Sequence, residues 1–211
     1  MKLSLYPKTE RIGTEQVIIT EKLDGSNLGI FKLNGEVYFA QRNYVFKYDE
    51  LTKENSYKGL RGWIEENTDS LNKLNEGSCV FGEWIGMGQI VYGGNLDKRF
   101  YIFAKANVRD GFDVSKINYD YNLFKYPFEG QEIPECIGVV PLVEELSLYP
   151  SINYLDTLYE QYIKKVDRGC EGFVVNSMGG IKKYVRMKNG KPSAHKGCIK
   201  WFVHYVVTIV R

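Results

Sequence analysis

EKLDGSN, residues 21–27, places a lysine at the end of a β-branched run (residues 16–22) and directly before a tight polar turn. Such a turn exposes the amine of Lys22 at a sheet edge, beside backbone N–H groups and short polar side chains. This arrangement suits a nucleophile that attacks a phosphate. Taken alone, a surface lysine before an ordinary Asp-Gly turn explains the segment as well, so its meaning depends on the rest of the chain.

Strand patterns dominate the sequence on both sides of this segment. Asn34-Gly35 separates two apolar alternations, and an Asn-Gly pair is the strongest short-range signal of a β-hairpin because both turn positions need positive φ. Pro141 would place the strand that contains it at an edge or a bulge, because proline donates no ladder hydrogen bond. The patterns predict strands at residues 16–22, 28–33, 36–41, 78–86, 99–108, 137–146, 170–176 and 181–188, and helices at 58–75 and 155–166. We therefore expect an α+β fold with mainly antiparallel sheets flanked by helices.

Length and charge exclude several classes of protein. The chain has 211 residues, 28 Lys plus Arg and 26 Asp plus Glu, for a formal charge of +2. This length indicates one large domain or one domain with an appendage. The near-neutral balance excludes a polybasic nucleic-acid binder, so contact with an anionic partner must come from a local patch.

Cysteine usage and apolar runs indicate the compartment. The 4 cysteines form no CxxC pair, which favours buried thiols in a reducing compartment over a zinc site or disulfides. The N-terminus has no apolar run, and the longest such run, residues 201–210, is too short to span a bilayer. We expect a soluble cytoplasmic protein with no membrane association.

Two later strands carry an acid among apolar residues, and a third carries cations. Glu83 lies in FGEW and Glu171 in CEGFVV, where a carboxylate is costly unless it is paired, binds a hydroxyl or helps to hold a metal. If residues 184–188 form a strand, Tyr184, Arg186 and Lys188 share one face, and the two cations suit a polyphosphate. Each segment alone is also explained by a solvated strand face.

In this order the segments resemble the covalent nucleotidyltransferase superfamily of DNA ligases, RNA ligases and mRNA capping enzymes. The resemblance spans residues 20–188. Its motifs are, in chain order, Lys22-Leu23-Asp24-Gly25 (KxDG, the first motif), Arg42 of the motif that follows, Phe81-Gly82-Glu83 (the third motif), the strand Tyr101-Ile102-Phe103, Glu171-Gly172-Phe173-Val174 (the fourth motif) and Arg186-Met187-Lys188 (the fifth motif). Within the superfamily, EKLDGSN and FGEW look most like RNA ligases of the phage nick-sealing type. The chain departs from the family pattern at Arg186, where lysine is usual, and at Ala104, where aspartate is common.

The resemblance implies a nucleotidyltransferase (ATP-grasp-like adenylation) domain and an ATP-dependent RNA ligase that forms a lysyl-AMP intermediate. Lys22 would be the nucleophile, and Arg186 and Lys188 would assist it at the phosphates. Glu171 would help to place Mg²⁺, with Mn²⁺ as an alternative, and the substrates would be ATP and RNA ends or a nicked RNA duplex. The residues implied to contact the nucleotide are Glu21, Lys22, Arg42, Glu83, Phe103, Glu171, Arg186 and Lys188.

Other interpretations stay open from the sequence. A DNA ligase, a capping-type guanylyltransferase that uses GTP and a non-catalytic RNA-binding derivative would carry a similar pattern. We expect a single adenylation domain over residues 1–211, with no C-terminal accessory domain evident after Lys188. The chain would then be a minimal ligase, a truncated catalytic domain, or a protein that takes extra RNA contacts from a partner protein.

Overall fold

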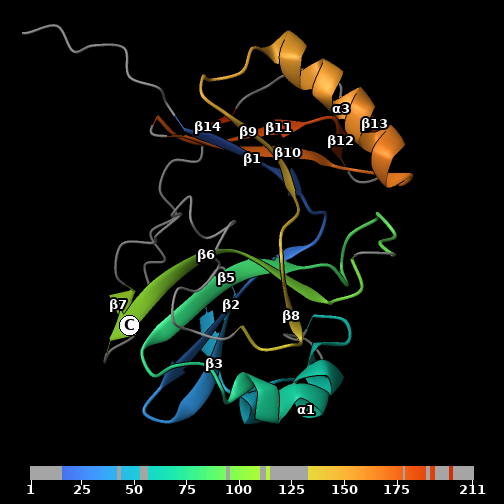
Figure 1. The fold of residues 1–211 in the computed structure, drawn as a ribbon. Helices are drawn as coiled ribbons and strands as arrows, with labels where there is room; N and C mark the ends of the chain where they lie inside the picture. Colours follow the sequence, from blue (N-terminus) through green and yellow to red (C-terminus); the bar gives the residue numbers. More distant parts are fainter. Residues whose placement is uncertain are drawn as a thin grey trace, which may run out of the picture.

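Two mainly antiparallel sheets, each with a helix on its outer face, form the body of the protein (Figure 1). The computed structural model describes residues 16–41, 44–52, 57–93, 96–109, 113–114, 133–177, 179–188, 191–192 and 200–201. The fold is α+β with mostly antiparallel pairing, as the sequence predicts. No helix within these residues is long and apolar enough to cross a membrane.

The first sheet carries the nucleophile segment. Its strands are, in spatial order, β14 (Lys200–Trp201), β11 (Gly180–Val185), β10 (Gly172–Ser177), β1 (Val17–Lys22) and β9 (Leu142–Leu146). Helix α3 (Ile152–Val166) covers one face through Leu155, Tyr159 and Tyr162, which pack on alternate residues of β1 and β10. Because side chains alternate along a strand, Lys22 points to the face opposite the helix, while Glu21 points toward it.

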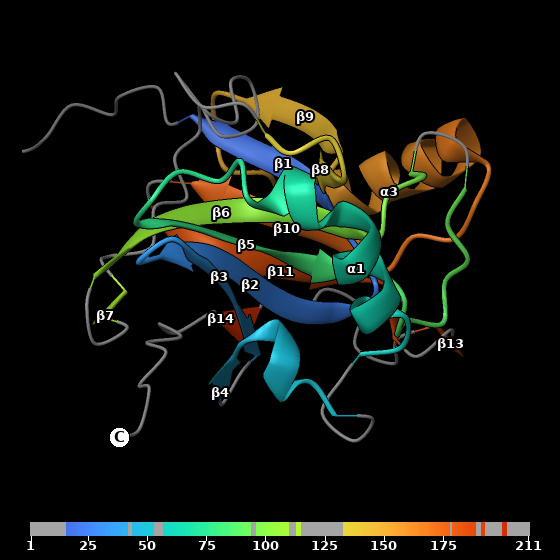
Figure 2. The same ribbon diagram turned by 90° about the horizontal axis from the view of Figure 1, so that it is seen from below.

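The second sheet lies below the first in Figure 1 and receives the chain directly after Lys22. Its path is β4 (Tyr44–Phe46), β3 (Glu36–Gln41), β2 (Ser26–Leu33), β5 (Ser78–Trp84), β6 (Phe100–Arg109) and β7 (Asp113–Val114), and β8 (Ile137–Val139) pairs with β6 in parallel. Helix α1 (Leu60–Leu71) covers its outer face (Figure 2). There Trp63 of the helix packs edge-on against Trp84, with ring centroids 5.4 Å apart. Short elements complete the chain: the 3₁₀ helix η1 (Tyr48–Glu50) and the pair β12 (Met187–Lys188) and β13 (Lys191–Pro192).

The predicted hairpin at Asn34-Gly35 is confirmed. Strands β2 and β3 pair antiparallel from Gly29–Ala40 to Leu33–Glu36, and the turn residues have φ of 53° and 78°. The Glu76 carboxylate accepts hydrogen bonds from the backbone N–H groups of both turn residues, which fixes the hairpin to the segment before β5.

The single strand predicted at residues 137–146 is wrong. The structure divides it into β8, which belongs to the second sheet, and β9, which belongs to the first. Pro141 lies at the break, and its carbonyl accepts the N–H of Glu21 at 2.9 Å, while Val140 donates its N–H to the carbonyl of Ile102 at 3.0 Å. Proline ends the ladder because it has no N–H to give, so the chain changes sheets here.

Within the described residues, the chain therefore passes between the sheets twice near one end of β1. One crossing is the Leu23–Gly25 turn, and the other is Val140-Pro141. A small buried apolar cluster lies at this junction. It consists of Leu23, Leu96, Tyr101 and Val140. The junction fixes where the end of β1 lies relative to β5 and β6.

Candidate active site

Lys22 and Glu171 form an ion pair at the junction. In the antiparallel register of β1 and β10, Lys22 lies opposite Gly172, so the residue before Gly172 reaches the lysine side chain. Nζ of Lys22 donates to Oε2 of Glu171 at 2.5 Å, and the two side chains are 20% and 14% exposed. The pair is thus largely shielded from water. A partly buried ion pair of this kind is screened less than one at the surface.

Gly172 makes this geometry possible. It has a φ of +150°, and a Cβ there would lie 2.0 Å from the carbonyl oxygen of Tyr184. The carbonyl of the preceding Glu171 accepts the N–H groups of Arg186 and Met187 at 2.9 and 3.0 Å. Only a glycine at position 172 allows β11 to approach the start of β10 this closely. This explains why glycine follows Glu171 in the fourth motif.

Glu83 brings a second carboxyl to the same place from the second sheet. It lies on β5 opposite Asn27 of β2 and Tyr101 of β6. The pKa of Glu83 is raised to about 7, mainly by burial; the positive charge of Lys22 opposes this shift, and the negative charges of Glu171 and Asp24 add to it. Near neutral pH this carboxyl therefore exists in both protonation states.

The pKa of Glu171 is also raised, first by burial. The charge and hydrogen bond of Lys22 oppose that shift, as does the charge of Lys183 on β11. We name the charged group formed by Lys22, Asp24, Glu83 and Glu171 the Lys22 cluster. It gathers residues from β1, the following turn, β5 and the segment before β10.

The turn after Lys22 is held by the segment that follows β5. Oδ2 of Asp24 accepts the N–H groups of Gln89 and Ile90 at 2.6 and 3.1 Å. A Cβ on Gly25 would lie 2.3 Å from the carbonyl oxygen of Trp84, so the turn packs directly on the end of β5. The Asp-Gly pair of the first motif is therefore needed for the shape of the turn.

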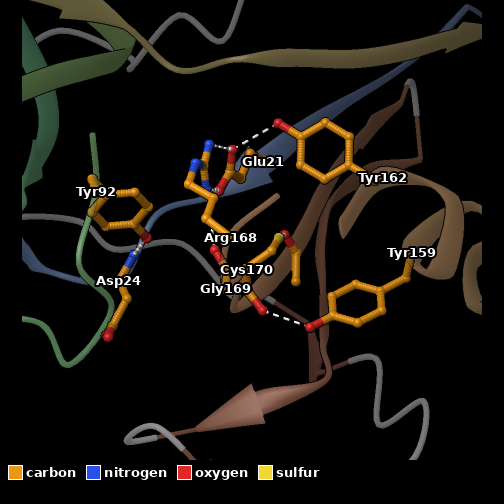
Figure 3. A network of polar contacts seen from close by, with 9 residues as sticks. Glu21, Asp24, Tyr92, Tyr159, Tyr162, Arg168, Gly169 and Cys170 are labelled. Atoms are coloured by element: carbon orange, nitrogen blue, oxygen red, sulfur yellow. Dashed lines mark hydrogen bonds and ion pairs between the residues drawn. The ribbon is translucent and has the colours of Figure 1, made fainter. Parts of the chain in front are cut away.

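Glu21 does not join the Lys22 cluster. Its carboxylate is 0% exposed and accepts two hydrogen bonds from the Arg168 guanidinium and one from the Tyr162 hydroxyl, on the side of α3 (Figure 3). The sequence implies a contact between Glu21 and the nucleotide. In this structure the carboxylate is already bound to these two residues.

The aromatic residues of β6 lie beside the junction. Tyr101 is buried in the cluster with Leu23, and its hydroxyl accepts the N–H of Lys98 at 2.9 Å. Phe103 is partly buried and packs against the same cluster, at the point where the register of β5 and β6 shifts. Its ring is therefore near the side of the second sheet that carries Glu83.

Arg186 lies apart from the Lys22 cluster. Its guanidinium is bound to Asp156 and, at 3.0 Å, to Glu160, both on α3, and it also donates to the Tyr184 hydroxyl. Tyr184 and Arg186 thus share a face, as predicted, and that face is the one under the helix. The side chain of Lys188 lies outside the described part, as does the whole of Arg42.

The carboxylates of the Lys22 cluster fit a divalent cation whose remaining ligands come mainly from a bound nucleotide. Within the described residues no three His, Cys, Asp or Glu side chains converge as a metal site. Mg²⁺ is commonly bound through one or two carboxylates plus substrate phosphates and waters rather than by a cage of protein ligands. Glu171, with Glu83 nearby, offers carboxylate oxygens of this kind.

Arg168, Tyr92 and Tyr162 were not singled out from the sequence. Arg168 and Tyr162 bind the Glu21 carboxylate, Tyr92 accepts the backbone N–H of Asp24, and the Arg168 guanidinium lies over the Tyr92 ring. The ion pair of Arg168 with Glu21 joins residues 147 apart in the chain. No local spacing signals such a contact, although Arg168 lies close before the fourth motif.

Comparison with known proteins identifies the family. The model of the RNA ligase family matches residues 15–193, so the chain belongs to the RNA ligase family. No curated protein matches the chain. Among solved structures, a Naegleria gruberi RNA ligase mutant with ATP and Mn is 19% identical over 82% of this chain and 50% of that chain, with a TM-score of 0.49. Another mutant of that ligase, with AMP and Mn, has the same identity and coverage and a TM-score of 0.48. The chain thus spans about half the length of these solved chains.

Proposed function

We propose that the protein is an ATP-dependent RNA ligase in which Lys22 carries AMP as a covalent intermediate. The observation that supports this best is the ion pair of Lys22 with Glu171, with the Glu83 carboxyl beside it. The pair orients Nζ at the end of β1, where the following turn is fixed by hydrogen bonds to Asp24. A held, partly shielded amine is what covalent catalysis on a phosphate requires.

In the first step Nζ of Lys22 attacks the α-phosphorus of ATP. An N–P bond forms, the bond to the bridging oxygen breaks, and pyrophosphate leaves with its electron pair. Before attack the ammonium must lose a proton, since lysine is ordinarily protonated near neutral pH. The Glu171 carboxylate, to which that ammonium donates, is within reach to accept the proton, and this leaves Nζ with the electron pair that forms the N–P bond.

The nucleotide contacts follow from the predicted motifs. Glu83 would hold a ribose hydroxyl, and its raised pKa allows it to accept or donate a hydrogen bond near neutral pH. Phe103 would pack on the adenine, and Arg42 would contact the ribose or the nucleic acid. Arg186 and Lys188 would face the phosphates. To do so Arg186 must leave Asp156 and Glu160. Glu171 would hold a divalent cation, Mg²⁺ or Mn²⁺, which when bound neutralises charge on the phosphate oxygens.

In the later steps AMP passes from Lys22 to the 5′-phosphate of RNA, and a 3′-hydroxyl displaces AMP to join the strands. We propose RNA ends or a nicked RNA duplex as the substrate, as in ligases of the phage nick-sealing type. ATP is the proposed nucleotide, while GTP use would indicate a capping-type enzyme.

Labelling of the protein with ATP or GTP carrying a radioactive α-phosphate, in the presence of Mg²⁺, tests the proposal. We expect an acid-labile adduct with ATP, none with Lys22→Ala, and normal labelling with Lys32→Ala. Lys32 is a suitable control because it lies on β2 and binds the carbonyl of Asn72. A Lys22→Ala protein that still forms the adduct would refute the assignment, and a ligation panel with RNA and DNA 3′-hydroxyl strands then decides the substrate.

A further inference from the structure

The guanidinium of Arg168 connects three segments around the nucleophile. Arg168 lies between α3 and β10, just before Glu171. Its Nη1 and Nη2 donate to Oε1 and Oε2 of Glu21 at 2.5 and 2.7 Å, and the Tyr162 hydroxyl of α3 donates to Oε2 at 2.7 Å (Figure 3). The Arg168–Glu21 ion pair is therefore bidentate, and both oxygens of the Glu21 carboxylate are held.

The same guanidinium reaches the other side of Lys22. Its carbon lies 5.1 Å from the centroid of the Tyr92 ring, and the Tyr92 hydroxyl accepts the backbone N–H of Asp24 at 2.7 Å. One cation therefore contacts the residue before the nucleophile directly and the turn after it through one aromatic ring.

We propose that Arg168 is a positioning residue that sets the backbone of Lys22 from both sides. This inference rests on the proposed function. Glu21 is fully buried, so its carboxylate is costly unless paired, and its pairing with Arg168 fixes strand β1 at the position next to Lys22. Tyr92 fixes the N–H of Asp24, and Arg168 itself anchors the chain that leads to Glu171.

The geometry makes a guanidinium necessary at this position. A lysine at 168 would keep the positive charge but lose the planar fork and the stacking on Tyr92. A displacement of about 1 Å in a reacting group can slow a reaction about 100-fold. Because the network binds the Glu21 side chain on one side of Lys22 and the backbone N–H of Asp24 on the other, its loss should affect the rate of attack more than the binding of ATP.

Single-turnover adenylation of the full chain tests the proposal, with the rate constant at saturating ATP, the half-saturating ATP concentration and the fraction of labelled protein measured separately. The variants are Arg168→Lys, Glu21→Gln and Tyr92→Phe. The last of these keeps the aromatic ring and removes only the hydroxyl group that accepts the N–H of Asp24. Arg61→Lys is the matched control, because Arg61 also lies over a tyrosine ring, at 4.9 Å from that of Tyr48, and binds the Leu51 carbonyl, but on α1.

We expect the rate constant of Arg168→Lys to fall about tenfold or more, with the half-saturating ATP concentration changed less than about threefold. Tyr92→Phe should show the same pattern to a smaller extent, and Arg61→Lys should match the wild type. In the double variant Glu21→Gln/Arg168→Lys, the loss should be smaller than the product of the two single losses, because the residues act as one unit.

A purely structural role gives a different result: the labelled fraction falls while the rate constant of the remaining active protein is unchanged. That outcome, or an unchanged rate constant in both Arg168→Lys and Tyr92→Phe, would overturn the inference and leave the proposed function intact. Failure of the wild-type protein to form any adduct would overturn the proposed function, and the positioning role with it.

Discussion

Nζ of Lys22 and Oε2 of Glu171 are 2.5 Å apart, although 149 residues separate them in the chain. The contact exists because β1 and β10 pair antiparallel with Lys22 opposite Gly172. It places the first and the fourth predicted motifs in one group of charges, together with Glu83 from the other sheet.

We predict that Glu171→Gln slows formation of the protein–AMP adduct about 100-fold or more, because it removes the charge that faces Lys22 while keeping the shape of the side chain. Quench-flow labelling with ATP measures the rate. Glu66→Gln serves as the control, since Glu66 is exposed on α1. Equal rates for Glu171→Gln and Glu66→Gln would contradict a site built around Glu171.

The raised pKa of Glu83 predicts a pH-dependent stability. Its pKa is about 7 in the folded protein against an ordinary 4.5, so between these values the folded state binds the extra proton. The contribution of Glu83 to stability is therefore fully present below pH 4.5 and is lost as pH rises through about 7. Glu83→Gln, which stays neutral, should gain stability relative to the wild type as pH rises.

Urea unfolding of both proteins at about pH 5 and about pH 8 measures this difference. We expect the unfolding free energy of Glu83→Gln minus that of the wild type to be larger at the higher pH, since each unit of pKa shift corresponds to about 1.4 kcal/mol. A difference that is the same at both pH values would show that the folded-state pKa of Glu83 is not raised.

Two glycine substitutions should act in opposite directions. A Cβ on Gly25 would lie 2.3 Å from the Trp84 carbonyl oxygen, so Gly25→Ala should destabilise the protein by about 1–3 kcal/mol and impair adduct formation. A methyl group on Gly62 would meet nothing within 4 Å beyond the backbone of its own helix α1, so Gly62→Ala should add about 0.5–1 kcal/mol through helix propensity. Thermal unfolding and ATP labelling of both variants check the pair, and a neutral Gly25→Ala would contradict the tight packing of the turn.

The role of Arg186 can be separated from that of its partners. If its guanidinium acts at the phosphates, Arg186→Ala should slow adenylation about tenfold or more, whereas Asp156→Ala, which removes one of its two carboxylate partners on α3, should not. Adenylation rates at saturating ATP are compared for the two variants. Equal slowing in both would indicate instead that Arg186 acts by holding α3 on the first sheet.

Local features of the fold were readable from the sequence. Asn34-Gly35 predicts a turn with two positive φ angles because few other residues adopt that conformation readily, and the structure has them. Amphipathic spacing likewise placed helices near α1 and α3, since one apolar stripe must face a sheet. The order of the motifs also predicts that Lys22, Glu83 and Glu171 belong to one site.

The tertiary structure alone decided which charges meet. Pairing of strands far apart in the chain brings Glu171 to Lys22. On the opposite face of β1, Glu21 forms an ion pair with Arg168. It also divides residues 137–146 between two sheets at Pro141, which the alternation of side chains could not show. The sequence by itself determined the local conformations, because backbone preferences act between near neighbours. Which charged partner each residue meets, and on which face of the sheet, was decided only by the register between strands that are far apart in the chain.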